Sequence, residues 1–394
     1  MDGSTLEMLL PELQAAILSY FPTLDSLYSS INASPRLFQV FASRKQQILS
    51  NMAMRQFHPA VLPDALATVK ASQLGDSPSR DSVLEFLGSL PQQYDVHTTA
   101  LLPEPTAVAL CQLHENISFF VAEFAQHALS IMTECSDFSA QREFQAVTGA
   151  QETSKPNLSE LETGRLQRAF CRFEVYRYLF AGCTTESVPN MTVAEQAHLF
   201  LERFPKWEVE EIACVRDYLM NRLCEVFNSM EDEFVEKEIA GNLPVRAESI
   251  LGRWEEEDRW FSSSQKLDHD SYMEYMLSLG LPFLRQAFRA TGEERKGMII
   301  SNSCRAGPRF LSKALHQPQQ DTEADRQDMT DHSGGVTVSF AEDRMDEPNE
   351  GWVWGHDYKP ALGWASGLRT ELRRVGYVFW DHKRMKESGV LSLR

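Results

Sequence analysis

Two pairs of neighbouring side chains in this sequence combine an imidazole with a carboxylate, the groups that acid–base catalysis and metal binding both use. They are His114-Glu115 and His269-Asp270. Adjacent residues of a helix point in different directions, so neither pair can act together on one substrate or ion. The sequence also contains no glycine-rich phosphate loop, nucleophile elbow, zinc-protease motif or calcium loop. It therefore predicts no enzyme activity, no cofactor and no metal site.

The seven cysteines do not change this prediction, because they are scattered along the chain and include no C-x-x-C pair. Zinc sites need closely spaced ligands, and a disulfide framework needs an even number of cysteines. Cys171, Cys214 and Cys224 lie within helical patterns. We expect them to be small residues of the core.

Composition and charge limit the classes of partner. The chain has 394 residues, 43% of them hydrophobic, which is enough for more than one compact unit. Its net charge of −18 disfavours direct binding to nucleic acid or to an anionic membrane, because phosphate groups attract basic surfaces. The first residues resemble no charged leader, and every long apolar run is interrupted. We expect a cytoplasmic or nuclear protein.

Apolar residues recur every three or four positions along most of the chain, which predicts an all-α fold. One stripe consists of Leu166, Phe170, Phe173, Tyr176 and Phe180, and a longer one of Ile212, Val215, Leu219, Leu223, Val226, Met230 and Phe234. The acidic residues along the longer stripe fall mainly on the other side and indicate a solvated face. These are Glu208, Glu210, Glu211, Asp217, Glu225, Glu231 and Asp232. A Gly280-Leu281-Pro282 sequence predicts a short helix-to-helix connection.

The first 50 residues predict three short helices. Pro11 fits the first turn of a helix that runs to about Tyr20, and Thr23 or Asp25 would cap a second helix that contains Leu24, Leu27 and Ile31. Ser34 before Pro35 indicates the start of a third. A unit this short cannot bury apolar residues on several sides by itself. Another part of the chain, or a partner, must cover them.

These residues resemble the F-box, a three-helix module that docks substrate receptors onto the Skp-family adaptor of cullin-RING ubiquitin ligases. The matching residues are Leu10-Pro11-Glu12-Leu13, Ile17-Leu18, Leu24, Leu27 and Ser34-Pro35-Arg36-Leu37-Phe38. The resemblance implies adaptor contacts by Leu10, Pro11, Leu13, Ile17, Leu18, Leu24, Leu27 and Leu37. Leu37 stands where an F-box usually has Trp or Phe, which implies a weaker contact there. More loosely, residues 204–219 and 372–389 resemble the F-box-like proteins of filamentous fungi, a group with no assigned chemistry.

The resemblance implies a substrate receptor that binds a Skp-family adaptor and a cullin scaffold and presents an unknown protein for ubiquitination. The alternative is a helical scaffold or interaction protein whose F-box-like start belongs to its own core. Exposure of Leu10, Pro11, Ile17 and Leu27 would distinguish the two. The sequence contains no repeat of 20 to 50 residues, so a recognition surface would lie on an irregular helical body.

We expect four parts: an F-box-like module (1–50), a helical body (51–318) with a possible linker at 148–160, an acidic mobile loop (319–350) and a loop-rich C-terminal arm (351–394). The loop has ten acidic residues against two arginines. Four of the seven tryptophans lie in the arm: Trp352, Trp354, Trp364 and Trp380. Their density favours an arm packed on the body, and the alternative is a recognition surface that these four rings line.

Overall fold

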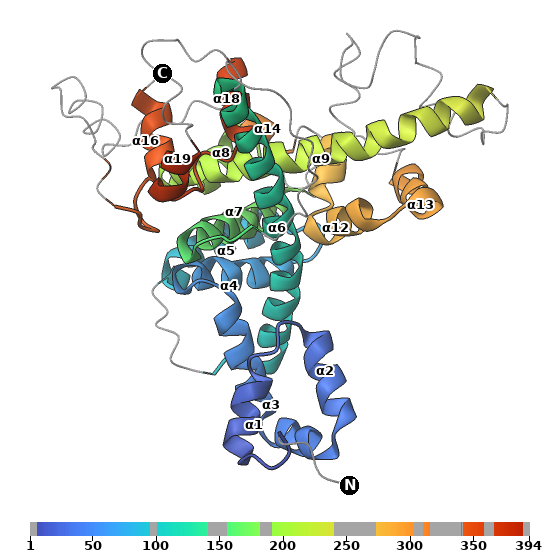
Figure 1. The fold of residues 1–394 in the computed structure, drawn as a ribbon, viewed down its shortest axis with the longest axis vertical. Coiled ribbons are helices and arrows are strands. Elements are labelled where there is room, and N and C mark those ends of the chain that lie inside the picture. The colour runs from blue at the N-terminus through green and yellow to red at the C-terminus, as the bar shows by residue number, and fades with distance from the viewer. Residues whose placement is uncertain are drawn as a thin grey trace.

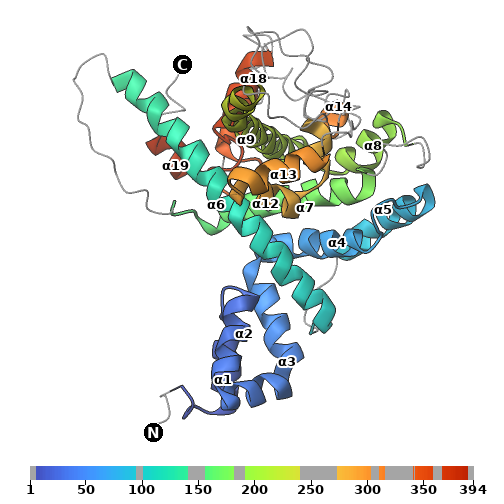
Figure 2. The same ribbon diagram turned by 90° about the vertical axis from the view of Figure 1, so that its right-hand side faces the viewer.

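A computed structural model describes residues 6–94, 101–140, 156–181, 191–239, 273–302, 310–315, 340, 342–357 and 366–388. All regular structure within these residues is helical, which confirms the all-α prediction (Figure 1). The N-terminal helices project from one end of a larger helical body (Figures 1 and 2). The fold is therefore described below from that end toward the C-terminal segment.

The projecting unit consists of α1 (Pro11–Leu18), α2 (Leu24–Ala33) and α3 (Pro35–Gln56). Pro11 and Pro35 stand in the first turns of their helices, where the missing N–H needs no partner. The cap of α2 is Thr23, whose side chain accepts from the Ser26 N–H while the Ser26 side chain accepts from the Thr23 N–H. These starts agree with the sequence pattern.

Helix α3 connects this unit to the body. Its backbone leaves helical geometry at Arg44 (φ −131°, ψ 24°), and the part beyond this kink packs along α6 (Glu104–Ala140). Leu102 lies two residues before α6. Its N–H donates to Ser50 Oγ at 2.9 Å, and its carbonyl accepts a hydrogen bond from Gln46 at 3.1 Å. The orientation of the N-terminal helices on the body is therefore held by hydrogen bonds as well as by apolar packing.

The body is built around α7 (Glu160–Phe180), which lies between α4 (Leu62–Ser72) and α9 (Lys206–Ile239). The predicted stripe of Leu166, Phe170, Phe173, Tyr176 and Phe180 is buried, as are Ile212, Val215, Leu219, Leu223 and Val226 of α9. The side chains of Met230 and Phe234 lie outside the described part of the chain. Helices α5 (Arg80–Tyr94) and α8 (Val193–Phe200) complete this side of the body.

Residues 273–278 are helical and end at Gly280, whose φ of +85° suits glycine. Helix α12 (Leu281–Arg289) begins directly after it with Pro282 in the first turn, so the predicted connection is confirmed. Helices α13 (Gly292–Asn302) and α14 (Ser312–Leu315) follow.

The C-terminal segment contains α16 (Glu350–Asp357), α18 (Ser366–Arg374) and α19 (His382–Glu387). The Trp380 side chain is completely buried, and its indole N–H donates to the Val375 carbonyl at 2.6 Å. Phe124 of α6 contacts the rings of both Phe379 and Trp380. This segment is therefore part of the core of the body.

The prediction of a solvated acidic face on α9 is wrong for its first turns. Glu208, Glu210 and Glu211 are buried and form ion pairs with arginines. The partners are Arg168 and Arg172 on α7 and Arg373 on α18, and no local sequence pattern links these positions. Glu225, further along the helix, is exposed as expected.

The predicted end of the acidic loop at residue 350 is also wrong. Within it, the carbonyls of Arg344 and Met345 accept hydrogen bonds from Arg165 and Arg168 of α7. Residues 342–350 are thus packed on the body. Residues 319–339 of the loop, and 148–155 of the possible linker, lie outside the described residues.

Candidate docking surface on the N-terminal helices

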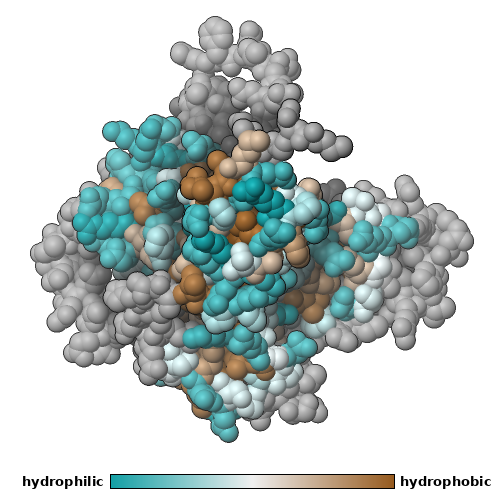
Figure 3. All heavy atoms as spheres, turned by 90° about the horizontal axis from the view of Figure 1, so that it is seen from below, coloured by the Kyte–Doolittle hydropathy of each residue, from teal (hydrophilic) through white to brown (hydrophobic). Residues whose placement is uncertain are grey.

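Large apolar side chains are exposed mainly at the N-terminal end of the molecule. Among the described residues eight stand out, and six of them fall between positions 8 and 38. The six are Met8, Leu10, Leu13, Ile17, Tyr20 and Phe38, and the other two are Leu84 and Leu101. Figure 3, which views the molecule from this end, shows brown apolar areas among the polar ones. Clustered apolar exposure of this kind marks interaction surfaces.

The exposure follows from the geometry of α1. Leu10, Leu13 and Ile17 are spaced by three and four residues, so they share one face of the helix. The opposite face carries Ala15 and Leu18, which are buried. Leu10 keeps 67% of its surface exposed, far more than a residue of a packed interface between helices would. Helix α1 is thus apolar on two faces, of which only one is covered.

Half of the residues that the F-box resemblance implies as contacts lie on this surface. Leu10, Pro11, Leu13 and Ile17 are exposed, whereas Leu18, Leu24, Leu27 and Leu37 are buried. The buried four form part of the core and can support a docking surface only indirectly. Phe38, at 53% exposure, is a surface residue that matches the F-box pattern but was not among the implied adaptor contacts. The helix start at Pro35 could have revealed it, because Leu37, Val40 and Phe41 then face inward and Phe38 outward.

Polar contacts hold the segment that precedes α1 against the other helices. Gln14 Nε2 donates to the Leu6 carbonyl at 3.0 Å, and Ser34 Oγ donates to Glu7 at 2.5 Å. Glu12 and Arg44 form an exposed ion pair at 2.6 Å, a kind of contact that contributes no more than about 1 kcal/mol. The apolar stripe is therefore bordered by polar groups that already have partners within the chain.

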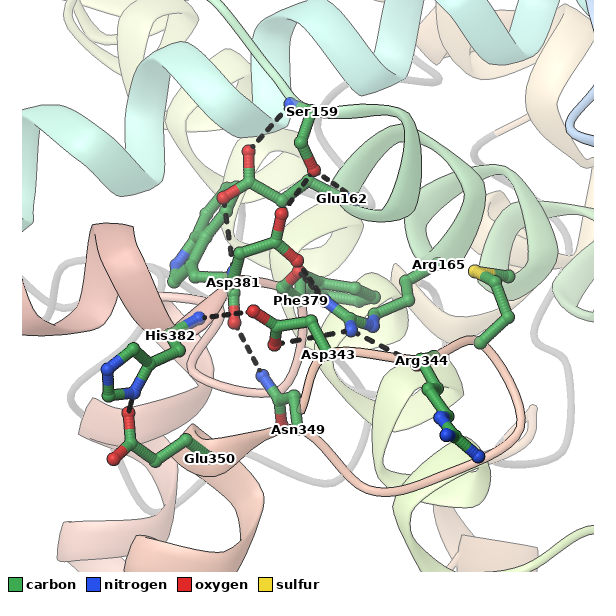
Figure 4. Close-up of polar contacts among 12 residues, drawn as sticks. Ser159, Glu162, Arg165, Asp343, Arg344, Asn349, Glu350, Phe379, Asp381 and His382 are labelled. Atoms are coloured by element: carbon green, nitrogen blue, oxygen red, sulfur yellow. Dashed lines mark hydrogen bonds and ion pairs between the residues drawn. The ribbon is translucent and has the colours of Figure 1, made fainter. Parts of the chain in front are cut away.

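A polar cluster between α7 and the C-terminal segment is the second place where functional groups gather (Figure 4). Arg165, which is almost completely buried, pairs with Asp381 at 2.8 Å and donates to the Phe379 carbonyl at 3.1 Å. Ser159 Oγ donates to the other oxygen of Asp381. The His382 ring does not join this group, because its Nδ1 contacts Glu350 at 2.5 Å. No serine–histidine relay is formed among these residues.

Glu162 is the most constrained carboxylate of this cluster. Burial alone would raise its pKa, but the Arg384 guanidinium and the backbone N–H groups of Ser159 and Asp381 donate to it and hold the pKa below its usual value. Arg384 binds both carboxylate oxygens, at 2.6 and 2.7 Å. Because these donors and acceptors satisfy one another, the cluster ties α19 to the start of α7.

The four tryptophans considered as a recognition surface do not form one. Trp380 is completely buried, so a surface that includes it is wrong. Trp352 and Trp354 are partly buried, and the ring of Trp352 meets that of Trp207 at 5.9 Å. Trp364 lies outside the described residues.

The other residues that the sequence suggested for a chemical role are packed among neighbouring side chains or lie outside the described residues. His114 packs against Phe57, and burial lowers its pKa to about 4, so its ring is neutral near pH 7. His269-Asp270 lies outside the described residues. Cys171, Cys214 and Cys224 are buried, as expected, and burial raises the pKa of the first two. Within the described ranges, no three His, Cys, Asp or Glu side chains are grouped as metal ligands.

Two further searches bear on the class of protein. None of the helices in the described ranges combines the length and the apolar character that crossing a membrane requires. Comparison with protein-family models, curated proteins and solved structures finds no match to this chain.

Proposed function

We propose that the N-terminal helices dock a Skp-family adaptor and that the chain serves as a substrate receptor of a cullin-based ubiquitin ligase. The observation that carries this proposal is the uncovered apolar stripe of Leu10, Leu13 and Ile17 on α1. It coincides with the Leu-Pro-Glu-Leu segment, the most specific part of the F-box resemblance. The cullin scaffold would be reached through the adaptor, and the protein presented for ubiquitination is unknown.

The size of the surface agrees with a specific interaction of ordinary strength. Complete burial of six fully exposed large apolar side chains contributes roughly 9 to 18 kcal/mol, at about 1.5 to 3 kcal/mol each. The six residues here are 38 to 73% exposed, so this range is an upper bound for the surface. Association costs about 4 to 15 kcal/mol in lost freedom of motion. The remainder allows a stable but reversible complex.

The arrangement of α3 also supports this function. A partner bound to α1 would be connected to the body through a helix that packs along α6 and that is fixed at Ser50 and Gln46. A protein held on the body would then keep a defined position relative to the adaptor. Such a fixed geometry is what a receptor needs to present its substrate.

The alternative is a scaffold that uses its F-box-like start as part of its own core. Of the four diagnostic residues, Leu27 is buried as this alternative requires. Leu10, Pro11 and Ile17 are exposed, which favours docking. The receptor is therefore the better supported function.

A pull-down with a purified Skp-family adaptor tests the proposal. The full chain should capture the adaptor, and Leu10→Ala combined with Leu13→Ala should reduce capture at least tenfold, because both side chains are exposed and neither supports the core. Leu84→Ala is the matched control, since Leu84 is an exposed leucine on α5 of the body. Failure of the unmodified chain to capture the adaptor, or equal capture by the double variant, would reject the docking function and favour the scaffold.

A further inference from the structure

A hollow lies between α6 and α12, on the body rather than on the N-terminal helices. Its volume is about 350 Å³, within the range of sites that hold small ligands or peptide side chains. It is lined by Asn116, Pro282, Arg285, Gln286, Arg289, Ala290 and Glu294. The two helices lie against each other in both ribbon views (Figures 1 and 2).

The hollow is polar because α12 is strongly two-sided. Leu281, Leu284 and Ala287 are completely buried, so the helix is anchored by its apolar face. Arg285 and Arg289 are one helical turn apart and therefore lie on the same side of α12. Two guanidinium groups are thus positioned over one concave surface.

The two arginines differ in whether other side chains of the protein already form hydrogen bonds with them. Arg285 donates to Asn116 Oδ1 at 3.0 Å and to Glu115 Oε1 at 2.8 Å, both on α6, and is thereby fixed. Arg289 is exposed, and none of the described residues accepts a hydrogen bond from it or pairs with it. The guanidinium of Arg289 remains available to a ligand, while that of Arg285 is held beside it by the ion pair with Glu115.

The charged side chains that line the hollow indicate which kind of ligand it can bind. The residues that line the hollow include two basic side chains, Arg285 and Arg289, and one acidic side chain, Glu294. Because Glu115 pairs with Arg285, Arg289 is the guanidinium that can bind a further carboxylate. Guanidinium groups bind carboxylates with paired, charge-assisted hydrogen bonds. Glu294 at the same hollow disfavours a run of acidic groups. A ligand with one carboxylate fits this combination best.

We propose that this hollow binds a peptide segment of a partner protein through a single carboxylate placed on Arg289. The side-chain amide of Gln286, which also lines the hollow, can hydrogen-bond the backbone of the segment. If the chain is a ligase receptor, this is the surface that receives the substrate. That last step rests on the proposed function, but the peptide site does not.

An array of random 12-residue peptides tests the site with the full chain. Each peptide is printed once with its Asp and Glu residues and once with Asn and Gln in their place. The chain should prefer the acidic form of the peptides it binds. Arg289→Glu should weaken that binding at least tenfold, with adaptor capture unchanged because α1 is not involved.

Lys383→Glu is the matched control, because Lys383 is an exposed residue of α19 and the substitution changes the net charge equally. It should leave peptide binding within about twofold. Equal binding of both peptide forms would overturn the proposal, as would equal losses in Arg289→Glu and Lys383→Glu. Full competition by acetate at a concentration matched to the peptide would identify a small-anion site and would also overturn it.

Discussion

Arg168 of α7 and Glu211 of α9 form a two-point ion pair inside the body. Arg168 Nε lies 3.0 Å from Glu211 Oε2, and Nη2 lies 2.6 Å from Oε1. The remaining Nη1 donates to the Met345 carbonyl at 2.5 Å and pairs with Glu208 at 2.7 Å. Burial lowers the pKa of Arg168, but the charges of Glu211 and Glu208 outweigh it and raise the pKa, so the guanidinium stays charged. One side chain thus joins α7, α9 and the C-terminal segment.

Glu211→Leu should therefore destabilise the protein strongly. The substitution leaves a buried arginine with only a shared carboxylate, and removing one partner of a buried pair costs about 3 to 5 kcal/mol. The free energy of unfolding from guanidinium denaturation measures the loss. Glu225→Leu, at an exposed position of the same helix, should change it by less than about 1 kcal/mol. Similar values for the two variants would show that the pair contributes little.

Trp380→Ala should cost about 3 to 5 kcal/mol, because it empties a completely buried site beside Phe124 and Phe379. A loss of stability of this size lowers the midpoint of chemical denaturation measurably. A midpoint equal to that of the unmodified chain would contradict the packing of the C-terminal segment described above.

Gly351→Ala tests the same packing by addition of one methyl group. A Cβ at this position would lie 2.0 Å from the backbone carbonyl oxygen of Tyr377, which cannot move without shifting the chain. We expect a thermal midpoint several degrees lower. Gly88 provides the opposite case, because it is in helix α5 and a Cβ there meets nothing within 4 Å. Gly88→Ala should increase the stability of the fold by about 0.5 to 1 kcal/mol. A higher thermal midpoint for Gly351→Ala than for Gly88→Ala would contradict the packing described for α16.

His114 should make stability depend on pH. Its pKa is about 4 in the folded protein, against an ordinary value of 6.5 that applies to the unfolded chain. Between these values the unfolded chain binds more protons, so stability falls as the pH decreases from 6.5 to 4 and stays low below that. The full loss is about 3 kcal/mol. Measured between these pH values, His114→Gln should show a correspondingly smaller decrease in unfolding free energy, and an unchanged decrease would contradict the burial of this ring.

The docking surface should be separable from the core of the N-terminal helices. Leu10→Ala removes an exposed side chain and should change stability by no more than about 0.5 kcal/mol. Leu27→Ala removes a completely buried one and should cost about 2 to 5 kcal/mol. Denaturation curves of the two single variants provide the comparison. A large effect of Leu10→Ala on stability would place that residue in the core.

The sequence alone was sufficient for the local features of this protein. Pro11 and Pro35 marked the starts of the first and third helices, and Gly280 with Pro282 marked a later connection, because caps and helix breakers act through neighbouring residues. For the second helix the sequence offered Thr23 or Asp25 as the cap, and Thr23 is the one that the structure shows. The periodicity of α7 likewise identified its buried aromatic residues.

Other features were decided only by the tertiary structure. Periodicity shows that α1 and α9 have apolar and polar faces, but it does not show which neighbour covers each face. Ile17 is exposed although it is apolar, because no described helix covers its side of α1, and Glu211 is buried although it is charged. Its partner Arg168 is 43 residues away in sequence. A charge can be buried only when an opposite charge is brought beside it, and the packing of whole helices determines that meeting.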